Sequence, residues 1–440
     1  MNITVHRGTH EIGGSCIELC SGNSRIILDI GMPLVNSDGG EFDIKAYDGL
    51  SGEGLVNESV LPNVGGLYEW EEPAIDAVLI SHAHQDHYGF LEHVHPDIPV
   101  YLSDGTQKLI EITASFRGWD NPLKSTQTFS WPSNFSIGDF TITPHLVDHS
   151  CFSAFAFEIE ADGYRTFYSG DFREHGNLGN AMDRLYKEVR PGVDALIMEG
   201  TMFGRSEERV QTEEELSQEA TEICKGTDKA IFIYQSGQNI SRSVSFFKAS
   251  LRSKRKYITD IYSAHVLGEL AKCSGGKGLP YPGKANYKSI YVWYPCLLTD
   301  RLMESGRQQI AFKYSPQKQT KEQMSEDLGK TMISVRPGME IDMRNIKGIE
   351  GSTLIYSLWD GYKTKNKTRQ FIDCMEKLGV NVKTLHTSGH ADLPALQHMV
   401  DKLQPKTLFP IHTFHPEKFE RFGVPVQKLE DGKAYDLSVS

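Results

Sequence analysis

The chain has 440 residues, of which 39% are hydrophobic and 24% are charged, and its formal net charge is −12. This composition is typical of a globular protein large enough for two domains, and it argues against a chain coated in positive charge for nucleic acid. No apolar run approaches the roughly 20 residues that cross a bilayer, and the N-terminus lacks a signal-peptide pattern. The seven scattered cysteines argue against a disulfide framework. We therefore expect a cytoplasmic protein with no membrane partner.

The first 204 residues predict a strand-rich region. Short apolar or alternating runs each end near Gly, Asp, Ser or His, and a few helical patterns separate them. Polar side chains at strand ends are the usual place for a functional site on such a scaffold. The expected strands cover residues 15–20, 24–31, 75–81, 98–103, 140–147, 152–160, 164–171 and 194–200.

The pattern changes near residue 205, where helical and strand patterns begin to alternate. Such alternation predicts a parallel α/β layer. After residue 378 polar residues follow strands again, as they do in the first region. We therefore expect a first domain over residues 1–204 and 379–440, interrupted by an inserted α/β domain over residues 205–378. Residues 248–257 carry five basic side chains and no acid, which fits either a solvated helix end or a phosphate-contacting rim.

The stretch LISHAHQDHYGF, residues 79–90, predicts a metal site. His82 and His84 follow an apolar strand and project to one side if the chain stays extended. Asp86 and His87 follow a turn, so two pairs of ligands can face one point. Four such groups placed together by accident would repel one another or lose solvation. Imidazole and carboxylate suit zinc, manganese or iron.

Three further candidates follow predicted strands: His149, Asp171 and His412. Either histidine alone would more often be structural, but together with residues 82–87 they make seven ligands. Two metal ions that share Asp171 would leave room for a water molecule, whose acidity they would raise. Two such ions roughly 3.5–4 Å apart suit hydrolysis of a phosphodiester.

These residues resemble the metallo-β-lactamase fold hydrolases. HAHQDH resembles the His-x-His-x-Asp-His motif of that superfamily, and SGD at 169–171 resembles its bridging aspartate. LIMEGTMFG at 196–204, TSGHAD at 387–392 and PIHTF at 410–414 resemble the motifs of the β-CASP branch, most closely those of ribonuclease J. The resemblance implies an αββα sandwich with an inserted α/β β-CASP cap. PIHTF departs from the pattern, with Thr413 and Phe414 where relatives often have Gly-Glu.

The resemblance also implies roles. It assigns His82, His84, His149 and Asp171 to one divalent ion, and Asp86, His87, Asp171 and His412 to a second, with zinc expected before manganese. Asp86, His390 and Glu199 are expected to act in catalysis. His390 would contact the scissile phosphate or protonate the leaving oxygen, and Glu199 would orient a ligand such as His87. A histidine at the position of His412 favours RNA over DNA as substrate.

Further substrate contacts are expected from two segments. Ser388 and Gly389 precede His390 in a turn that could hold phosphate, and Asn239, Ser241 and Arg242 lie near a predicted helix start. Each segment also has a plain alternative, an ordinary turn or a helix cap. The prediction is a two-metal ribonuclease, acting internally or from a 5′ end. A DNA nuclease of the same branch, a hydrolase of small esters or lactones, and a homodimer stay open.

Overall fold

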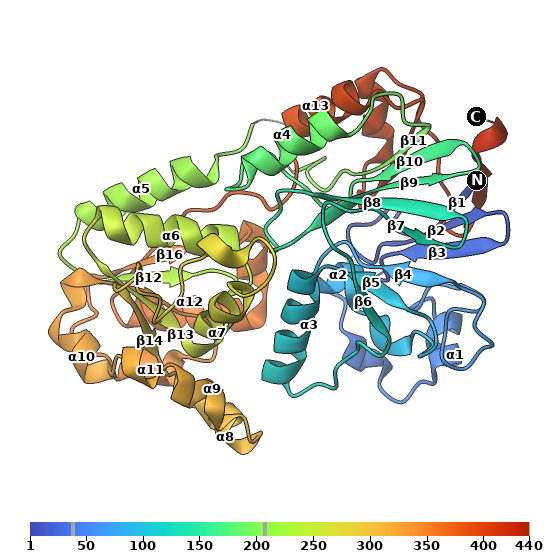
Figure 1. Cartoon of the computed structure of the whole chain (residues 1–440). Coiled ribbons are helices and arrows are strands. Elements are labelled where there is room, and N and C mark those ends of the chain that lie inside the picture. Colours follow the sequence, from blue (N-terminus) through green and yellow to red (C-terminus); the bar gives the residue numbers. More distant parts are fainter. Residues whose placement is uncertain (37–39, 206–208, 440) are drawn as a thin grey trace.

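The computed structural model describes residues 1–36, 40–205 and 209–439. Its strands form three sheets, of which two pack face to face and the third lies beside them (Figure 1). No helix in the described part of the chain combines the length and the apolar character that crossing a membrane requires.

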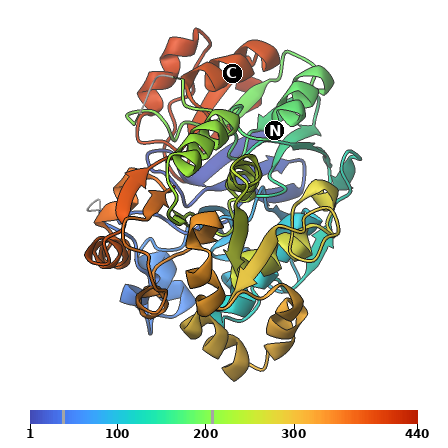
Figure 2. The ribbon, with the colours of Figure 1, turned by 90° about the vertical axis from the view of Figure 1, so that its left-hand side faces the viewer.

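The first sheet is mixed, with its antiparallel part at the two ends of the chain. Strand β19 pairs with β1, so the N- and C-terminal segments lie side by side in both ribbon views (Figures 1 and 2). The pairs β1–β2 and β2–β3 are antiparallel, whereas β3 to β6 run parallel. In spatial order the strands are β19 (Ala434–Asp436), β1 (Asn2–Arg7), β2 (Cys16–Ser21), β3 (Ser24–Leu28), β4 (Ala77–Leu79), β5 (Val100–Leu102) and β6 (Thr126–Thr128).

The second sheet ends in three parallel strands. Strands β7 to β10 form an antiparallel meander, and β11 and β18 then add in parallel to β10. In spatial order the strands are β18 (Thr407–Ile411), β11 (Ala195–Glu199), β10 (Tyr164–Tyr168), β9 (Phe155–Ala161), β8 (Phe140–Leu146) and β7 (Phe135–Ile137). Strands β11 and β18 are neighbours in the sheet, although more than two hundred residues separate them in the sequence. The chain therefore leaves the second sheet after β11 and rejoins it beside the same strand.

Alternating side chains from these two sheets form the central core. Ile17, Ile26 and Leu28 of the first sheet share a fully buried cluster with Phe157 and Ile197 of the second. Helices cover both outer faces, α1 (Gly52–Asn57), α2 (Gln85–Tyr88) and α3 (Asp104–Arg117) on the first sheet and α4 (Gly179–Glu188) and α13 (Leu393–Leu403) on the second. Their order, helix on sheet on sheet on helix, confirms the predicted αββα sandwich.

The third sheet is entirely parallel and comes from the inserted segment. Its strands are short continuous apolar runs such as IFIY and TLIY, the pattern of strands buried on both faces. In spatial order they are β14 (Ile290–Trp293), β13 (Lys256–Asp260), β15 (Thr331–Ser334), β12 (Ile231–Tyr234), β16 (Thr353–Tyr356) and β17 (Asn381–Thr384). Strand β17 lies past residue 378, so the return to the sandwich comes after Thr384, later than predicted.

Helices pack on both faces of this third sheet. Helices α5 and α6 cover one face, and α11 and α12 cover the other. Helix α5 begins at a capping box of Thr212 and Glu215, as its acidic first turn indicates. The bounds are α5 (Glu213–Lys225), α6 (Ile240–Arg252), α7 (Ile261–Leu270), α8 (Cys296–Glu304), α9 (Gln308–Lys313), α10 (Lys321–Glu326), α11 (Glu340–Arg344) and α12 (Asn366–Lys377).

Candidate metal centre

The carboxyl ends of parallel strands from both sandwich sheets meet at one edge. In the first sheet β3 is followed by Asp29 and β4 by His82. In the second sheet Asp171 follows β10, Glu199 ends β11 and His412 follows β18. Parallel strands carry their chain ends to the same edge, so residues far apart in sequence become neighbours there.

The 82–87 segment turns a corner within this edge. His84 has extended backbone, with φ −93° and ψ 143°, and is the N-cap of helix α2. His82 and His84 therefore precede the helix, while Asp86 and His87 belong to its first turn. The turn predicted between the two pairs is present.

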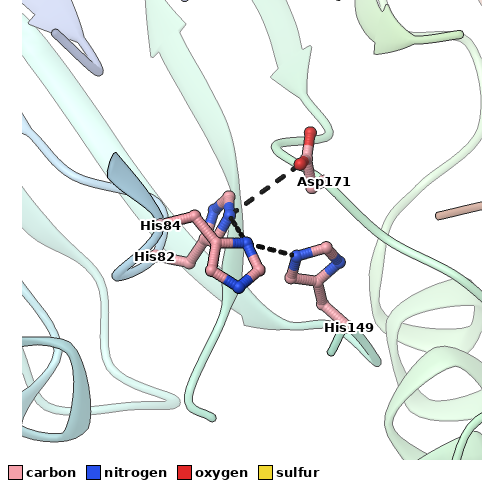
Figure 3. A group of neighbouring side chains, drawn as sticks. All are labelled: His82, His84, His149 and Asp171. Carbon is pink, nitrogen blue, oxygen red and sulfur yellow. Dashed lines mark hydrogen bonds and ion pairs between the residues drawn. The ribbon is translucent and has the colours of Figure 1, made fainter. Parts of the chain in front are cut away.

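The first cluster consists of His82, His84, His149 and Asp171 (Figure 3). His84 Nδ1 lies 3.0 Å from His82 Nε2 and 3.1 Å from His149 Nε2. His82 Nε2 lies 3.8 Å from Asp171 Oδ2. One potential ligand atom from each of the four residues lies within 4.8 Å of the others.

The second cluster consists of Asp86, His87, Asp171 and His412, and it meets the same 4.8 Å limit. His87 Nε2 lies 3.3 Å from Asp171 Oδ2, and His412 Nε2 lies 3.4 Å from Asp86 Oδ2. Asp171 thus belongs to both clusters. It also belongs to a third grouping with Glu199, His390 and His412.

The donor atoms fit divalent cations. Both carboxylate oxygens of Asp171 and Nε2 of His87 are buried, and none has a hydrogen-bond partner among the described residues. A buried carboxylate without donors is costly unless a cation compensates it. Imidazole nitrogens and carboxylate oxygens in four-membered sets are the ligands that zinc and related ions take.

The charge states of the first cluster suit the same role. Burial, aided by the neighbouring imidazoles, holds the pKa values of His82 and His149 well below their usual range. Burial also lowers the pKa of His84 to about 4. Burial opposes ionisation of Asp171, but the surrounding histidines outweigh it and hold its pKa well below normal. Neutral imidazoles beside an ionised carboxylate are the forms that bind metal.

Asp29 orients His87, a role that the sequence analysis missed. Its Oδ2 accepts hydrogen bonds from His87 Nδ1 at 2.7 Å, from the Tyr168 hydroxyl at 2.5 Å and from the Ser81 hydroxyl at 2.7 Å. Its Oδ1 accepts from Ser81 N at 2.7 Å. In the neutral ring, donation from Nδ1 leaves the lone pair of His87 on Nε2, toward Asp171. An aspartate directly after the apolar strand IIL was the available signal.

Glu199 does not contact His87, so the expectation that it orients this ligand is corrected. The Nδ1 proton of His87 is already taken by Asp29. Glu199 Oε2 instead accepts from His390 Nδ1 at 3.0 Å and from the Thr201 hydroxyl at 2.6 Å. That hydroxyl in turn accepts from His412 Nδ1 at 2.7 Å. Glu199 therefore orients His390 directly and His412 through Thr201.

His390 lies beside the second cluster, and its Nε2 makes no hydrogen bond to any residue that the structure describes. Its Nδ1 is 3.5 Å from Asp171 Oδ2. Burial alone would lower its pKa, but the carboxylates of Glu199 and Asp171 outweigh burial and raise it. Its backbone N–H donates to the Ser388 hydroxyl at 3.0 Å. Gly389 is needed between them, because a Cβ there would lie 2.7 Å from Ser150 Oγ.

The predicted contacts at 239–242 are placed differently. Asn239 lines the cleft, but its side chain caps α6 by accepting from Arg242 N at 2.9 Å. Ser241 contacts Asn177, and Ser241 is not among the cleft-lining residues. Arg242 is fully buried, where it pairs with Glu213 and donates to Thr387 O. The prediction that Ser241 and Arg242 contact substrate is therefore wrong, because neither residue lines the cleft.

A cleft of about 1440 Å³ opens over the clusters, between the sandwich and the third sheet. It contains His84, Asp86 and the loop 386–390. Its basic residues are Arg117, Arg205, Arg209, Arg301, Arg336 and Lys367. None of residues 248–257 lines it, and Lys248 and Arg252 pair with Glu214 instead. Those contacts favour the helix-end alternative for that run.

Two family descriptions match the chain. "Beta-lactamase superfamily domain" matches residues 62–234, and "Zn-dependent metallo-hydrolase RNA specificity domain" matches residues 377–418. The first match contains His82 to Asp171, and the second contains His390 and His412. Together with the donor set, they assign the centre to divalent metal ions.

Among curated proteins, ribonuclease J of Sinorhizobium meliloti is 23% identical over 400 residues, covering 86% of this chain and 66% of that protein. Ribonuclease J of Helicobacter pylori is 21% identical, covering 99% of this chain and 61% of that protein. Transcription termination factor FttA of Methanothermobacter thermautotrophicus is 31% identical, covering 47% of this chain and 32% of that protein. The chain thus spans less than two thirds of the length of these relatives.

Among solved structures, a protein of unknown function from Enterococcus faecalis V583 has the same fold. Its TM-score is 0.79 at 21% identity, with 99% of each chain covered. The architecture of two facing sheets with a separate parallel sheet is therefore found in an experimental structure. The two domain matches and the ribonuclease J relatives together support a metallo-β-lactamase protein of the β-CASP kind that is similar to ribonuclease J.

Proposed function

We propose that the chain is a two-metal phosphodiesterase that hydrolyses RNA, internally or from a 5′ end. The observation that carries the proposal is the sharing of Asp171 between two four-residue clusters. Shared carboxylates are typical of paired-metal sites that act on phosphodiesters. The match of residues 377–418 to an RNA specificity domain supports RNA, since that segment carries His390 and His412.

The first ion would be held by His82, His84, His149 and Asp171, and the second by Asp86, His87, Asp171 and His412. Zinc is the first expectation, because nitrogen-rich sets with carboxylate suit it, and manganese is the alternative. When bound, the two ions supply Lewis-acid activation of water and positive charge beside the reacting phosphate.

The chain's own groups position substrate and move the proton. His390 is held by Glu199 through Nδ1, so Nε2 is the ring atom that can donate a proton to the leaving oxygen. The hydroxyl of Ser388 fixes the backbone of His390, and Gly389 lets the loop approach Ser150. Asp29 and Thr201 hold the ligand tautomers of His87 and His412.

The same proposal divides the chain. Residues 1–204 together with those after the third sheet would form the catalytic domain, and residues 205 to 384 would form the cap. RNA would lie in the cleft between them, where the basic side chains collect. A locally basic cleft on a chain of net charge −12 would concentrate a polyanion at the site.

The test is digestion of end-labelled single-stranded RNA carrying either a 5′ phosphate or a 5′ hydroxyl, with DNA of the same sequence alongside. We expect RNA cleavage that the Asp86→Ala, His87→Ala double variant abolishes together with bound metal. The matched control is Asp401→Ala, His398→Ala on α13, an exposed acid and a half-buried histidine that pairs with Glu174 and belongs to neither cluster. Faster turnover of DNA, or of p-nitrophenyl esters alone, would replace the RNA assignment.

A further inference from the structure

An exposed tryptophan faces the same cleft as the metal clusters. Trp359 and Tyr362 line the cleft together with Arg205, and His84 and Asp86 line it too. Trp359 is 43% exposed and Tyr362 is 36% exposed. We call Arg205, Trp359 and Tyr362 the aromatic platform. Indole rings are on average largely buried in folded proteins, as Trp293 is at 1% exposure.

The three side chains of the aromatic platform contact one another, Arg205 over the face of Trp359 and Tyr362 edge-on to it. The guanidinium carbon of Arg205 lies 4.5 Å from the Trp359 ring centroid. The Tyr362 ring meets Trp359 edge-on, at 5.4 Å between centroids and 88° between planes. Arg205 makes no ion pair with any described carboxylate within 4.0 Å, although it is exposed in the cleft. An exposed guanidinium in the cleft has the chemistry to contact a phosphate.

The backbone under the platform is held in place. Trp359 follows strand β16, and its carbonyl accepts from the Tyr356 hydroxyl and from Tyr362 N, both at 3.0 Å. Lys365 Nζ lies 4.6 Å from the Tyr362 ring centroid and pairs with Glu41 at 2.5 Å. Glu41 belongs to the sandwich side, so this pair ties the platform across the cleft. A rigid ring loses little entropy on stacking.

The platform lies near the clusters. Arg205, Trp359 and Tyr362 line the same cleft as Asp86, Thr201 and His390, and the Thr201 hydroxyl contacts His412 Nδ1 at 2.7 Å. A ring in this cleft can meet a nucleotide held over the clusters. Stacking on an aromatic ring is independent of base identity, because every base presents a π-face.

Resting on the proposed function, we propose that the aromatic platform binds the base of one nucleotide beside the scissile phosphate by stacking on Trp359, while Arg205 contacts a flanking phosphate. The ligand class is a single-stranded nucleotide of any base. No other described residue of the cleft offers an exposed indole.

The experiment is an abasic scan. Short single-stranded RNAs, each lacking one base at a different position from the cleavage site, are compared by kcat/KM in wild type and in Trp359→Ala. We expect one position at which loss of the base costs wild type about tenfold, the order of one base–aromatic stack. At that position the loss should cost Trp359→Ala nothing, and Trp359→Phe should keep part of the sensitivity.

Trp119→Ala is the matched control. Trp119 is 48% exposed and has Arg117 stacked at 4.5 Å, but it is not among the cleft-lining residues. It should retain the full abasic penalty. The inference is overturned if wild type cleaves RNA while Trp359→Ala shows the same abasic profile, or if Trp119→Ala loses the penalty equally. If wild type cleaves no RNA, the proposed function itself fails, which is a separate outcome.

Discussion

Replacing Asp29 by asparagine tests the orientation of the metal ligands. Three donors converge on Oδ2 of Asp29, from His87, Tyr168 and Ser81. In Asp29→Asn an amide NH₂ faces them while Oδ1 still accepts from Ser81 N. The two hydroxyls can rotate to accept from the NH₂ group. The imidazole cannot, so His87 must move its proton to Nε2, the atom that faces Asp171 at 3.3 Å.

The size of the effect follows from that tautomer change. A protonated Nε2 cannot bind a cation, and restoring the other tautomer means losing a buried hydrogen bond. Changes to the orienting partners of metal ligands typically cost about 10–100-fold in metal affinity, equivalent to ~1.4–2.8 kcal/mol. We expect a loss in that range at the site formed by Asp86, His87, Asp171 and His412, with the site of His82, His84 and His149 affected less.

The assay is zinc binding by competition with a fluorescent chelator, read as two dissociation constants. Asp260→Asn is the matched control, because Asp260 is equally buried at a strand end, where it caps α7 and touches none of the clusters. It should lower stability and leave metal affinity unchanged. Equal metal affinities in wild type and Asp29→Asn would refute the tautomer reasoning.

Four further variants and one treatment test the site and the fold that supports it. His390→Asn should lower kcat by ~10²–10⁴-fold with metal content unchanged; parallel loss of metal, measured by mass spectrometry, would contradict its assignment to proton transfer. Asp171→Asn should lose both ions per chain, whereas His149→Ala should weaken one; equal metal content in the two would argue against sharing. Glu213 is buried, and although burial opposes ionisation, Arg242 and Arg173 lower its pKa from 4.5 to about 2. Its ionisation therefore stabilises the fold above pH 4.5, and that contribution, about 3 kcal/mol, is lost as the pH falls toward 2. Urea unfolding across that range should show a shallower loss for Glu213→Gln, and identical slopes would refute the assignment. Chelation should lower the melting temperature, since a ligand at about a thousandfold over its Kd adds ~4 kcal/mol; an unchanged melting temperature would count against metal binding in the fold.

The sequence predicted the sandwich because its central strands are marked by burial. Runs such as RIIL and ALIME are almost wholly apolar and end in Gly, Asp or Glu. Strands β1, β6, β7 and β19 were not predicted. β6 and β19 are short and largely exposed, and they pair at sheet edges, so their hydrophobic pattern is weak. A strand was expected at β17 but was assigned to the first domain, because its pairing with β16 in the third sheet leaves no mark in the sequence.

The site residues divide in the same physical way. The ligands from His82 to His87 could be predicted from the sequence, because they lie within six residues at a spacing typical of metal sites. Asp29 leaves a weaker signal, an aspartate after an apolar strand, because its partner His87 is brought to it only by packing. Arg242 was wrongly predicted to contact substrate. A basic residue at a helix start suggests phosphate binding, but the side chain of Arg242 is buried in an ion pair with Glu213. Pairing partners distant in sequence decide both cases.

The adjacency of β11 and β18 has a consequence for synthesis. The ribosome makes β11 first, then the whole third sheet with its helices, and only then β18 with His412. A nascent chain can therefore assemble the cluster of His82, His84, His149 and Asp171 early, but not the second cluster. Completion of the second cluster therefore waits until the inserted segment has been synthesised. A chain that stops before β18 lacks His412 and with it the complete second cluster.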